Sequence, residues 1–149
     1  SLDTMDPIKY KQITRGGDIN QVIAGIDAAV KAGLNPVKIN CVTTPETSPD
    51  EIHALEKFCK ERSLEIRYIK KMDLAAGKYW KVKGGKGGHC KICNRVRLTA
   101  TGNFIPCLFS ENEFNIKEYG IMRAFELAVG GKPLKGKMNS KNEFYNIGG

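Results

Sequence analysis

Residues 36–42 of this chain read Pro-Val-Lys-Ile-Asn-Cys-Val, and residues 66–69 read Ile-Arg-Tyr-Ile. The first run is short and β-branched, a pattern typical of a strand that is buried on both faces. Between the two runs, Ser48-Pro49-Asp50-Glu51 forms a capping box with proline at the first helical position, which predicts the start of a helix. A strand, a crossover helix and a second strand together predict a parallel β-α-β unit.

A further helix is expected before this unit. Asp18 is its expected N-cap, apolar residues recur at helical spacing after it, and Gly33 is expected to end it. A shorter helix is predicted over residues 6–14. Residues 18–69 therefore predict the order α-β-α-β, from which barrels and doubly wound sheets are built.

The second half of the chain follows a different pattern. Residues 75–88 lose periodicity and end in a glycine-rich stretch, which predicts a loop. Residues 95–100 and 104–108 flank Thr101-Gly102-Asn103, which predicts a β-hairpin. A last helix is expected from about residue 116 to residue 129, with little signal for structure after it.

The change of pattern suggests two regions. Residues 1–74 are expected to form an α/β segment, and residues 75–149 a C-terminal region with a hairpin and a helix. A chain of 149 residues is near the commonest size of a single domain, so we expect the two regions to pack together as one domain.

Charge and composition narrow the class of protein. The chain has 24 Lys and Arg residues against 16 Asp and Glu, a net charge of +8, which favours an anionic partner. The lysines are scattered rather than gathered in one run, so an ordinary basic surface explains the charge equally well, and nucleic acid is not an expected partner. No stretch approaches the roughly 20 apolar residues of a membrane span, and no secretory signal is present. We therefore expect a cytoplasmic protein without a membrane partner.

Three of the five cysteines lie close together in the sequence. Cys90 and Cys93 form a Cys-x-x-Cys motif, in which one turn can direct both thiolates at one ion, and Cys107 returns across the expected hairpin. Cys41 and Cys59 lie in apolar surroundings, and the odd total argues against a disulfide framework. The pattern predicts a metal site whose ligands are Cys90, Cys93 and Cys107.

Two kinds of metal centre fit this pattern. Zinc requires a fourth protein ligand, for which His89 is the nearby candidate, although adjacent side chains such as His89 and Cys90 converge poorly on one ion. An iron–sulfur cluster needs one ligand per iron and can leave one iron open. Two other interpretations stay open: three unrelated buried cysteines, or a thioredoxin-like redox pair, which would require the motif to open a helix directly after a strand.

The residues around these cysteines resemble a known family. Residues 90–102 follow the pattern Cys-x₂-Cys-Asn-Arg-x-Arg-Leu-Thr-Ala-x-Gly, and Cys107-Leu108-Phe109 comes next. This is similar to the C-terminal cluster motif of the GTP 3′,8-cyclases, radical S-adenosylmethionine enzymes of the lyase class that begin molybdenum cofactor biosynthesis. Four further segments occur in the same order as in that family: Ser1-Leu2-Asp3, Arg15-Gly16-Gly17, residues 36–40 and Ile147-Gly148-Gly149.

The resemblance implies a cofactor and a substrate. In the family the three cysteines hold a [4Fe–4S] cluster whose fourth iron is free for the guanine of GTP, so Cys90, Cys93 and Cys107 would be the cluster ligands. Arg95 and Arg97 match family residues that contact GTP.

Other residues match the family outside the cysteine motif. Lys38 and Arg67 match basic residues that meet the triphosphate of GTP. A cation inside an apolar strand is costly to bury unless an anion pairs with it, although either residue could lie at a strand end with its charge in water. Ser1 and Met72 match positions near S-adenosylmethionine. In the family Gly148-Gly149 reaches back into the active site, whereas a glycine pair at a chain end is otherwise expected to fray.

The chain also departs from the family in two ways. The radical-generating cluster of the family is bound by a Cys-x₃-Cys-x₂-Cys motif, and this spacing does not occur here. Only seventeen residues separate Met72 from Cys90, where the family has a much longer segment of helix and strand. Because the chain starts with Ser1 and lacks the motif, we expect either a shortened or split relative, whose partner is a separate N-terminal half, or an excised piece.

The resemblance therefore predicts an α/β fold, part of an incomplete (β/α) barrel followed by a cysteine-bearing hairpin and a helix, that binds a [4Fe–4S] cluster and GTP. Residues 1–74 would be the α/β half-barrel segment, and residues 75–149 the region that binds the iron–sulfur cluster and substrate. No catalytic residue is assigned, and a homodimer is left open. One rival is a structural zinc module with a basic surface that binds nucleic acid. The other is a relative that keeps the fold, lacks a metal and serves as an interaction surface.

Overall fold

The computed structural model describes residues 1–147, so Gly148 and Gly149 lie outside the described residues. The chain divides into two compact units. The first unit comprises Ser1–Lys71 and Val82–Gly85, and the second comprises Met72–Lys81 and the chain from Lys86 onward. The boundary predicted between residues 74 and 75, and the packing of the two regions as one domain, stay predictions.

The first unit has the predicted α-β-α-β order after a short initial helix. Its elements are α1 (Pro7–Ile13), α2 (Ile19–Lys31), β1 (Lys38–Thr43), α3 (Pro49–Glu61) and β2 (Glu65–Lys70). The two strands are parallel, with a register that runs from Lys38↔Glu65 to Thr43↔Lys70. The parallel β-α-β unit predicted from the sequence is therefore confirmed.

The helices of this unit begin where the sequence places their caps. Asp6 and Asp18 accept backbone hydrogen bonds at the starts of α1 and α2. At the start of α3, Ser48 accepts from the Glu51 N–H at 3.2 Å, while the Glu51 carboxylate accepts from the Ser48 N–H at 3.0 Å. This reciprocal pair is the predicted capping box, and it satisfies two backbone donors that a helix start otherwise leaves unpaired.

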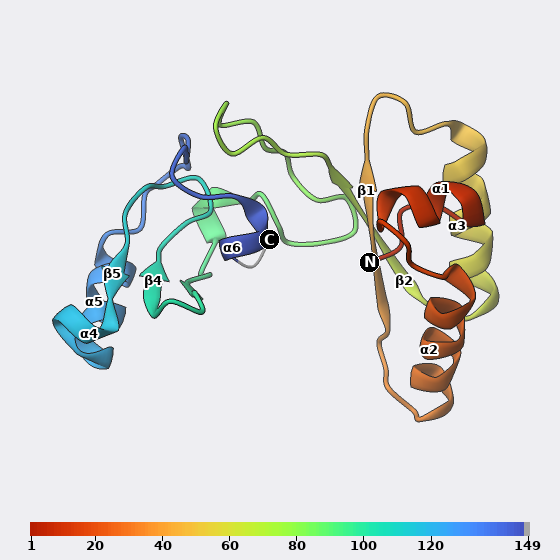
Figure 1. Ribbon diagram of the computed structural model, residues 1–149, viewed down its shortest axis with the longest axis horizontal. Coiled ribbons are helices and arrows are strands. Elements are labelled where there is room, and N and C mark those ends of the chain that lie inside the picture. The colour runs from red at the N-terminus through yellow and green to blue at the C-terminus, as the bar shows by residue number, and fades with distance from the viewer. Residues whose placement is uncertain (148–149) are drawn as a thin grey trace. The chain divides into compact units, whose positions relative to one another are not determined.

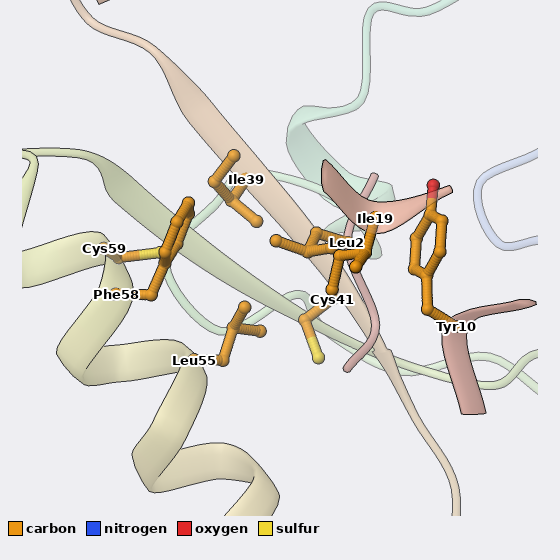
Figure 2. Close-up of a cluster of buried hydrophobic side chains, with 8 residues drawn as sticks. All are labelled: Leu2, Tyr10, Ile19, Ile39, Cys41, Leu55, Phe58 and Cys59. Carbon is orange, nitrogen blue, oxygen red and sulfur yellow. The ribbon is translucent and has the colours of Figure 1, made fainter. Parts of the chain in front are cut away.

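The core of the first unit lies on one face of the β1–β2 pair. Figure 1 shows α1, α2 and α3 all on the same side of these strands. Figure 2 shows the buried side chains that fill the space between them, with Leu55 and Phe58 of α3 beside Ile39 and Cys41 of β1. Cys59 is 2% exposed, so its predicted core position is confirmed.

The expected burial of β1 on both faces is wrong. Ile39 and Cys41 are buried, whereas Lys38 is exposed and Asn40 is half-buried, so burial alternates along the strand. The helices cover only the face that carries Ile39 and Cys41, and successive residues of a strand point to opposite faces. The apolar residues of β1 therefore predicted more burial than the strand has in the structure.

Each outer edge of the β1–β2 pair is met by an irregular segment of the same unit. The Leu2 N–H donates to the Asn40 carbonyl at 3.0 Å, so the start of the chain runs along β1. Tyr68 of β2 exchanges two backbone hydrogen bonds with Lys83, at 3.0 and 3.1 Å. Within residues 1–147 the only parallel sheet has two strands and no barrel is closed, so the expected half-barrel is not confirmed.

The second unit contains the predicted hairpin. It consists of β3 (Arg97–Leu98) and β4 (Asn103–Ile105), which pair antiparallel with Arg97 opposite Ile105. A third strand, β5 (Phe114–Asn115), pairs with β4 and was not predicted. The strands are shorter than expected because the ladder stops before Cys107.

The last predicted helix is divided. It forms α4 (Ile116–Tyr119) and α5 (Ile121–Gly130), and Gly120 between them has φ +74°, a left-handed conformation that ends the first helix. The tail, for which no structure was predicted, contains a short helix α6 (Phe144–Ile147). None of the helices within residues 1–147 combines the length and the apolar character that a membrane crossing requires.

A buried polar residue in this tail bonds it to the rest of the second unit. Asn139 is fully buried; its backbone N–H donates to the Leu74 carbonyl at 2.9 Å, and its side-chain amide donates to the Leu108 carbonyl at 3.0 Å. The apolar cluster beside it consists of Leu74, Ile105, Phe109 and Ile147. The tail is thus held across the segment that carries Cys107.

Candidate functional site

Cys90 and Cys93 lie on one tight turn of the second unit. The 3₁₀ helix η1 (Cys90–Ile92) contains the first cysteine, and the Cys93 N–H donates back to the Cys90 carbonyl at 3.2 Å. Both cysteines are half-buried. The turn expected from the Cys-x-x-Cys spacing is therefore present.

The thiol of Cys90 has two polar neighbours. The Tyr79 hydroxyl lies 3.2 Å from the Cys90 Sγ and 3.2 Å from the Gly136 carbonyl, so its one proton lies between two possible acceptors. Burial raises the pKa of the Cys90 thiol, but hydrogen bonds from the Tyr79 hydroxyl and the Gly136 N–H, together with the charge of Lys135, outweigh burial and lower this pKa overall. Burial and the bond to Cys90 raise the pKa of Tyr79 to about 12, so its hydroxyl keeps its proton at neutral pH. The surroundings of Cys90 favour its thiolate.

Cys107 lies two residues beyond the end of β4. A β-carbon on Gly136 would be only 3.2 Å from the Cys107 sulfur and 2.6 Å from the Phe109 β-carbon, so the absence of a side chain at Gly136 allows the two segments to approach. Burial raises the pKa of the Cys107 thiol, and the charges of Cys90 and Cys93 add to this effect. Gly136 therefore contacts Cys107 and, through Tyr79, also lies beside Cys90.

The three cysteines all belong to the second unit, but their side chains do not converge on one point within the described residues. All five cysteines of the chain are free. Within residues 1–147, no three side chains of His, Cys, Asp or Glu are grouped closely enough to hold a metal ion. His89, the candidate fourth zinc ligand, is half-buried beside Cys90 and caps η1 only through its backbone. The three thiols have the chemistry that a metal centre requires, and the predicted ligand set stays a prediction.

Arg95 and Arg97 lie between the two cysteine segments in the sequence. Arg97 opens β3 and is half-buried, whereas Arg95 precedes the strand and is exposed. Burial and the charge of Arg95 lower the pKa of Arg97, while the nearby Cys107 and Cys93 thiols raise it. A guanidinium of Arg97 close to these cysteines supplies positive charge where an anionic ligand could bind.

The basic residues predicted in the first unit share one face of the sheet. Lys38 pairs in register with Glu65, and Asn40 with Arg67. Paired residues point to the same face, so these four side chains lie opposite the face that carries the helices. Lys38 Nζ lies 3.7 Å from Glu65 Oε2, and both side chains are substantially exposed.

Arg67 is in a different position from Lys38. Its Nε atom is buried and has no hydrogen-bond partner in the described part of the chain. Gly85 lies against it, with the position of a β-carbon 3.4 Å from the Arg67 Cδ. A buried donor on a permanently charged group without a partner is unusual, and an anion on this face would provide one.

The remaining predicted residues are placed as follows. Ser1 is exposed at the start of the first unit, beside the segment that runs along β1, and Met72 is half-buried at the start of the second unit. Gly148 and Gly149 lie outside the described residues. The roles of these four residues stay predictions, as do the GTP-binding roles of Lys38, Arg67, Arg95 and Arg97.

Three residues of the second unit that contact the cysteine segments were not predicted from the sequence. Tyr79 belongs to the stretch predicted as a loop, and Lys132 and Gly136 to the tail for which no structure was predicted. Lys132 Nζ donates to the carbonyls of Arg95 and Pro106 at 2.6 and 2.8 Å. No periodicity or motif marks these three residues, because their importance arises only from contacts with segments distant in sequence.

Comparison with known proteins identifies relatives of the chain. No family model and no solved structure matches it. Among curated proteins, it is 32% identical to the GTP 3′,8-cyclase of Petrotoga mobilis over 197 residues, which covers 97% of the chain and 61% of the relative. The enzyme of the same name from Pseudomonas putida is 30% identical, with 83% of the chain and 51% of the relative covered. A Clostridium botulinum GTP 3′,8-cyclase is 29% identical, with 100% and 63% covered.

The chain is homologous to a C-terminal part of the GTP 3′,8-cyclases. It spans between 51% and 63% of the length of these three relatives. The aligned stretches of 197 and 202 residues are longer than the 149-residue chain, so these GTP 3′,8-cyclases contain residues inside the stretch that this chain lacks. The resemblance predicted from the cysteine motif is confirmed.

Proposed function

We propose that this chain is the cluster-binding and GTP-binding part of a GTP 3′,8-cyclase that acts in molybdenum cofactor biosynthesis. Cys90, Cys93 and Cys107 would hold a [4Fe–4S] cluster. Such a cluster, when bound by three thiolates, offers one iron with an open coordination position to a substrate atom. The chain's own residues supply the thiolates, the nearby positive charge and the enclosure of the sulfurs.

One observation carries the proposal: Cys90 and Cys107, seventeen positions apart, both lie at Gly136 in a chain related to these enzymes. A β-carbon at Gly136 would occupy the space beside the Cys107 sulfur, and the Tyr79 hydroxyl links Gly136 to the Cys90 sulfur. Thiolates are the ligands that iron–sulfur clusters take from proteins. The donor set therefore fits the proposed cluster in its chemistry.

Basic residues in each unit would contact GTP. Arg97, near the cysteines, and the exposed Arg95 would contact GTP beside the cluster. On the sheet face of the first unit, Lys38 and Arg67 would pair with the triphosphate, and the unpartnered Arg67 Nε would donate to one of its oxygens. This role accounts for a charged donor that the described residues leave unsatisfied.

Catalysis would depend on components that this sequence does not contain. Ser1 and Met72 would lie near S-adenosylmethionine, and Gly148-Gly149 would extend into the active site. The cluster that cleaves S-adenosylmethionine would come from an N-terminal half with its own cysteine motif. In the complete enzyme, hydrogen abstraction from the GTP ribose would be followed by attack of the carbon radical on the guanine ring.

The test is the metal content of the chain after purification and reconstitution with ferrous iron and sulfide without oxygen. We expect about four iron and four sulfide per chain with a brown visible spectrum, lost when Cys90, Cys93 and Cys107 are all replaced by serine. A matched variant, Cys41→Ser with Cys59→Ser, should keep the cluster if it folds, because both residues belong to the apolar core of the first unit. Stoichiometric zinc without iron uptake would contradict the proposal and favour a structural zinc module.

A further inference from the structure

The ammonium group of Lys132 connects two segments that carry cysteines. Lys132 follows α5 and is half-buried, and its Nζ donates to the Arg95 carbonyl at 2.6 Å and to the Pro106 carbonyl at 2.8 Å. Arg95 lies two residues after Cys93, and Pro106 directly precedes Cys107. One side chain thus holds the backbone beside two of the three proposed ligands.

These two hydrogen bonds occur where the hairpin ladder ends. The last pair of β3 and β4 on this side is Arg97 opposite Ile105. Beyond that pair the two strands form no further ladder hydrogen bond. Cys93 and Cys107 lie on the two segments that continue from this end of the hairpin. The ammonium group of Lys132 bonds both carbonyls and so connects the two segments where the ladder is absent. Hydrogen bonds from a charged donor are stronger than those from a neutral donor.

The residues after Lys132 contact the same region. Gly136 lies against the Cys107 sulfur, and its carbonyl accepts from the Tyr79 hydroxyl that reaches Cys90. The Lys137 N–H donates to the Phe109 carbonyl at 2.9 Å. The segment from Lys132 to Lys137 therefore lies against Cys107, is linked to Cys90 through Tyr79, and bonds the backbone two residues after Cys93.

We infer that Lys132 is a positioning residue, which holds the segment after Cys93 to the segment before Cys107 so that the three thiolates can bind one metal centre. This inference rests on the proposed function, because it requires the three cysteines to be ligands. Lys132 itself contacts backbone carbonyls, so its effect on the metal is exerted through the positions of the cysteines. Residues that orient ligands in this way commonly change metal affinity by about 10- to 100-fold when they are replaced.

The experiment measures the rate at which reconstituted protein loses iron to a chelator without oxygen. Lys132→Met keeps the aliphatic chain and removes the donor, and we expect it to lose iron about 10- to 100-fold faster than the unchanged chain. Lys132→Arg should restore much of the retention, because a guanidinium can donate to two carbonyls. Lys117→Met, which removes an exposed lysine of the same unit, should behave like the unchanged chain.

Thermal unfolding of the metal-free proteins separates positioning from folding. Faster iron loss from a Lys132→Met protein that unfolds like the unchanged chain would support the inference, and equal retention would overturn it. Should Lys132→Met fail to fold, Lys132→Gln, which keeps a donor for one carbonyl, decides in the same way. If the unchanged chain takes up no iron, the proposed function fails and this inference fails with it.

Discussion

At the residue scale, Arg67 combines a cost to folding with a proposed contribution to binding. Its Nε is buried and has no partner among residues 1–147, whereas Lys38 on the same sheet face is exposed near Glu65. A buried donor without a partner costs about 1–3 kcal/mol of folding free energy. The exposed Lys38–Glu65 pair contributes little, because water screens it. We therefore expect Arg67 to matter more for ligand binding than for stability.

Replacing Arg67 by methionine should weaken GTP binding without destabilising the chain. Loss of a charged hydrogen bond to a phosphate oxygen, worth about 1.5–3 kcal/mol, corresponds to an affinity lower by about 10- to 100-fold. The free energy of unfolding without ligand should stay the same or rise, because an unsatisfied donor is removed. Titration calorimetry with GTP and denaturant unfolding measure the two effects.

The matched control for this variant is Arg123→Met. Arg123 is exposed on α5 and pairs with Glu126 at 3.2 Å, so its loss should change neither quantity appreciably. Equal GTP affinity in the Arg67→Met variant and the unchanged chain would rule out the proposed role of Arg67.

Cys41 should make the stability of the chain sensitive to alkaline pH. Burial, with the charges of Asp3, Cys59 and Glu51, raises the pKa of Cys41 from 9.0 to about 11. The folded state then keeps the proton while the unfolded state releases it. Stability from this source is complete below pH 9 and is lost as the pH rises from 9 toward 11. Between pH 8 and 10 we expect a loss of about 1 kcal/mol from Cys41.

A Cys41→Ala variant isolates this contribution. The smaller side chain lowers stability at every pH, but it removes the thiol that titrates. Denaturant unfolding at pH 8 and pH 10 should show a smaller pH dependence in the variant than in the unchanged chain. Identical pH dependence would show that Cys41 keeps an ordinary pKa in the folded state.

At the scale of the elements, three helices of the first unit end in the same hydrogen-bond pattern. The Gly16 N–H donates to the Lys11 carbonyl, Leu34 to Ala29, and Leu64 to Cys59, which is the Schellman arrangement. The preceding residue is left-handed in each case: Arg15 with φ +59°, Gly33 with φ +77° and Ser63 with φ +55°. Only α2 has glycine at this position. Gly33 therefore marked the left-handed position at the end of α2 in the sequence, whereas Arg15 and Ser63 are not residue types that predict this conformation.

Ser63→Gly should stabilise the first unit. A side chain in the left-handed region is strained by about 1 kcal/mol, and glycine relieves that strain. Thermal unfolding should show a higher midpoint for Ser63→Gly and an unchanged one for Ser63→Ala, which keeps the β-carbon. The reverse change, Gly33→Ala, should lower stability by a similar amount; because no atom lies within 4 Å of the added carbon, backbone strain alone would be responsible. A Ser63→Gly protein no more stable than Ser63→Ala would contradict this account.

At the scale of the whole molecule, the missing cysteine motif limits what the chain can do alone. With dithionite, GTP and S-adenosylmethionine in the absence of oxygen, we expect no 5′-deoxyadenosine above background, because the sequence has no Cys-x₃-Cys-x₂-Cys spacing. A full-length relative assayed in parallel provides the positive control. Product that forms in proportion to this chain, and disappears in the Cys90, Cys93 and Cys107 triple serine variant, would contradict the expectation.

The sequence by itself determined the features that depend on neighbouring residues. The capping box at Ser48 and the alternation of helix and strand predicted the β-α-β unit, and the Cys90-x-x-Cys93 spacing predicted a turn. The family relationship also follows from this local pattern, since the residues after Cys93 match in order. Caps, turns and periodicity are satisfied within a few residues, so they can be recognised without knowledge of the fold.

Only the tertiary structure decided which residues surround the cysteines and which face of β1 is covered. Lys132 and Tyr79 meet the cysteine segments through hydrogen bonds to partners eleven or more positions away, and Gly136 does so because a side chain would not fit beside Cys107. The apolar residues of β1 suggested burial on two faces, but helices pack against one. Such features depend on which distant segments pack together, and no local pattern encodes that choice.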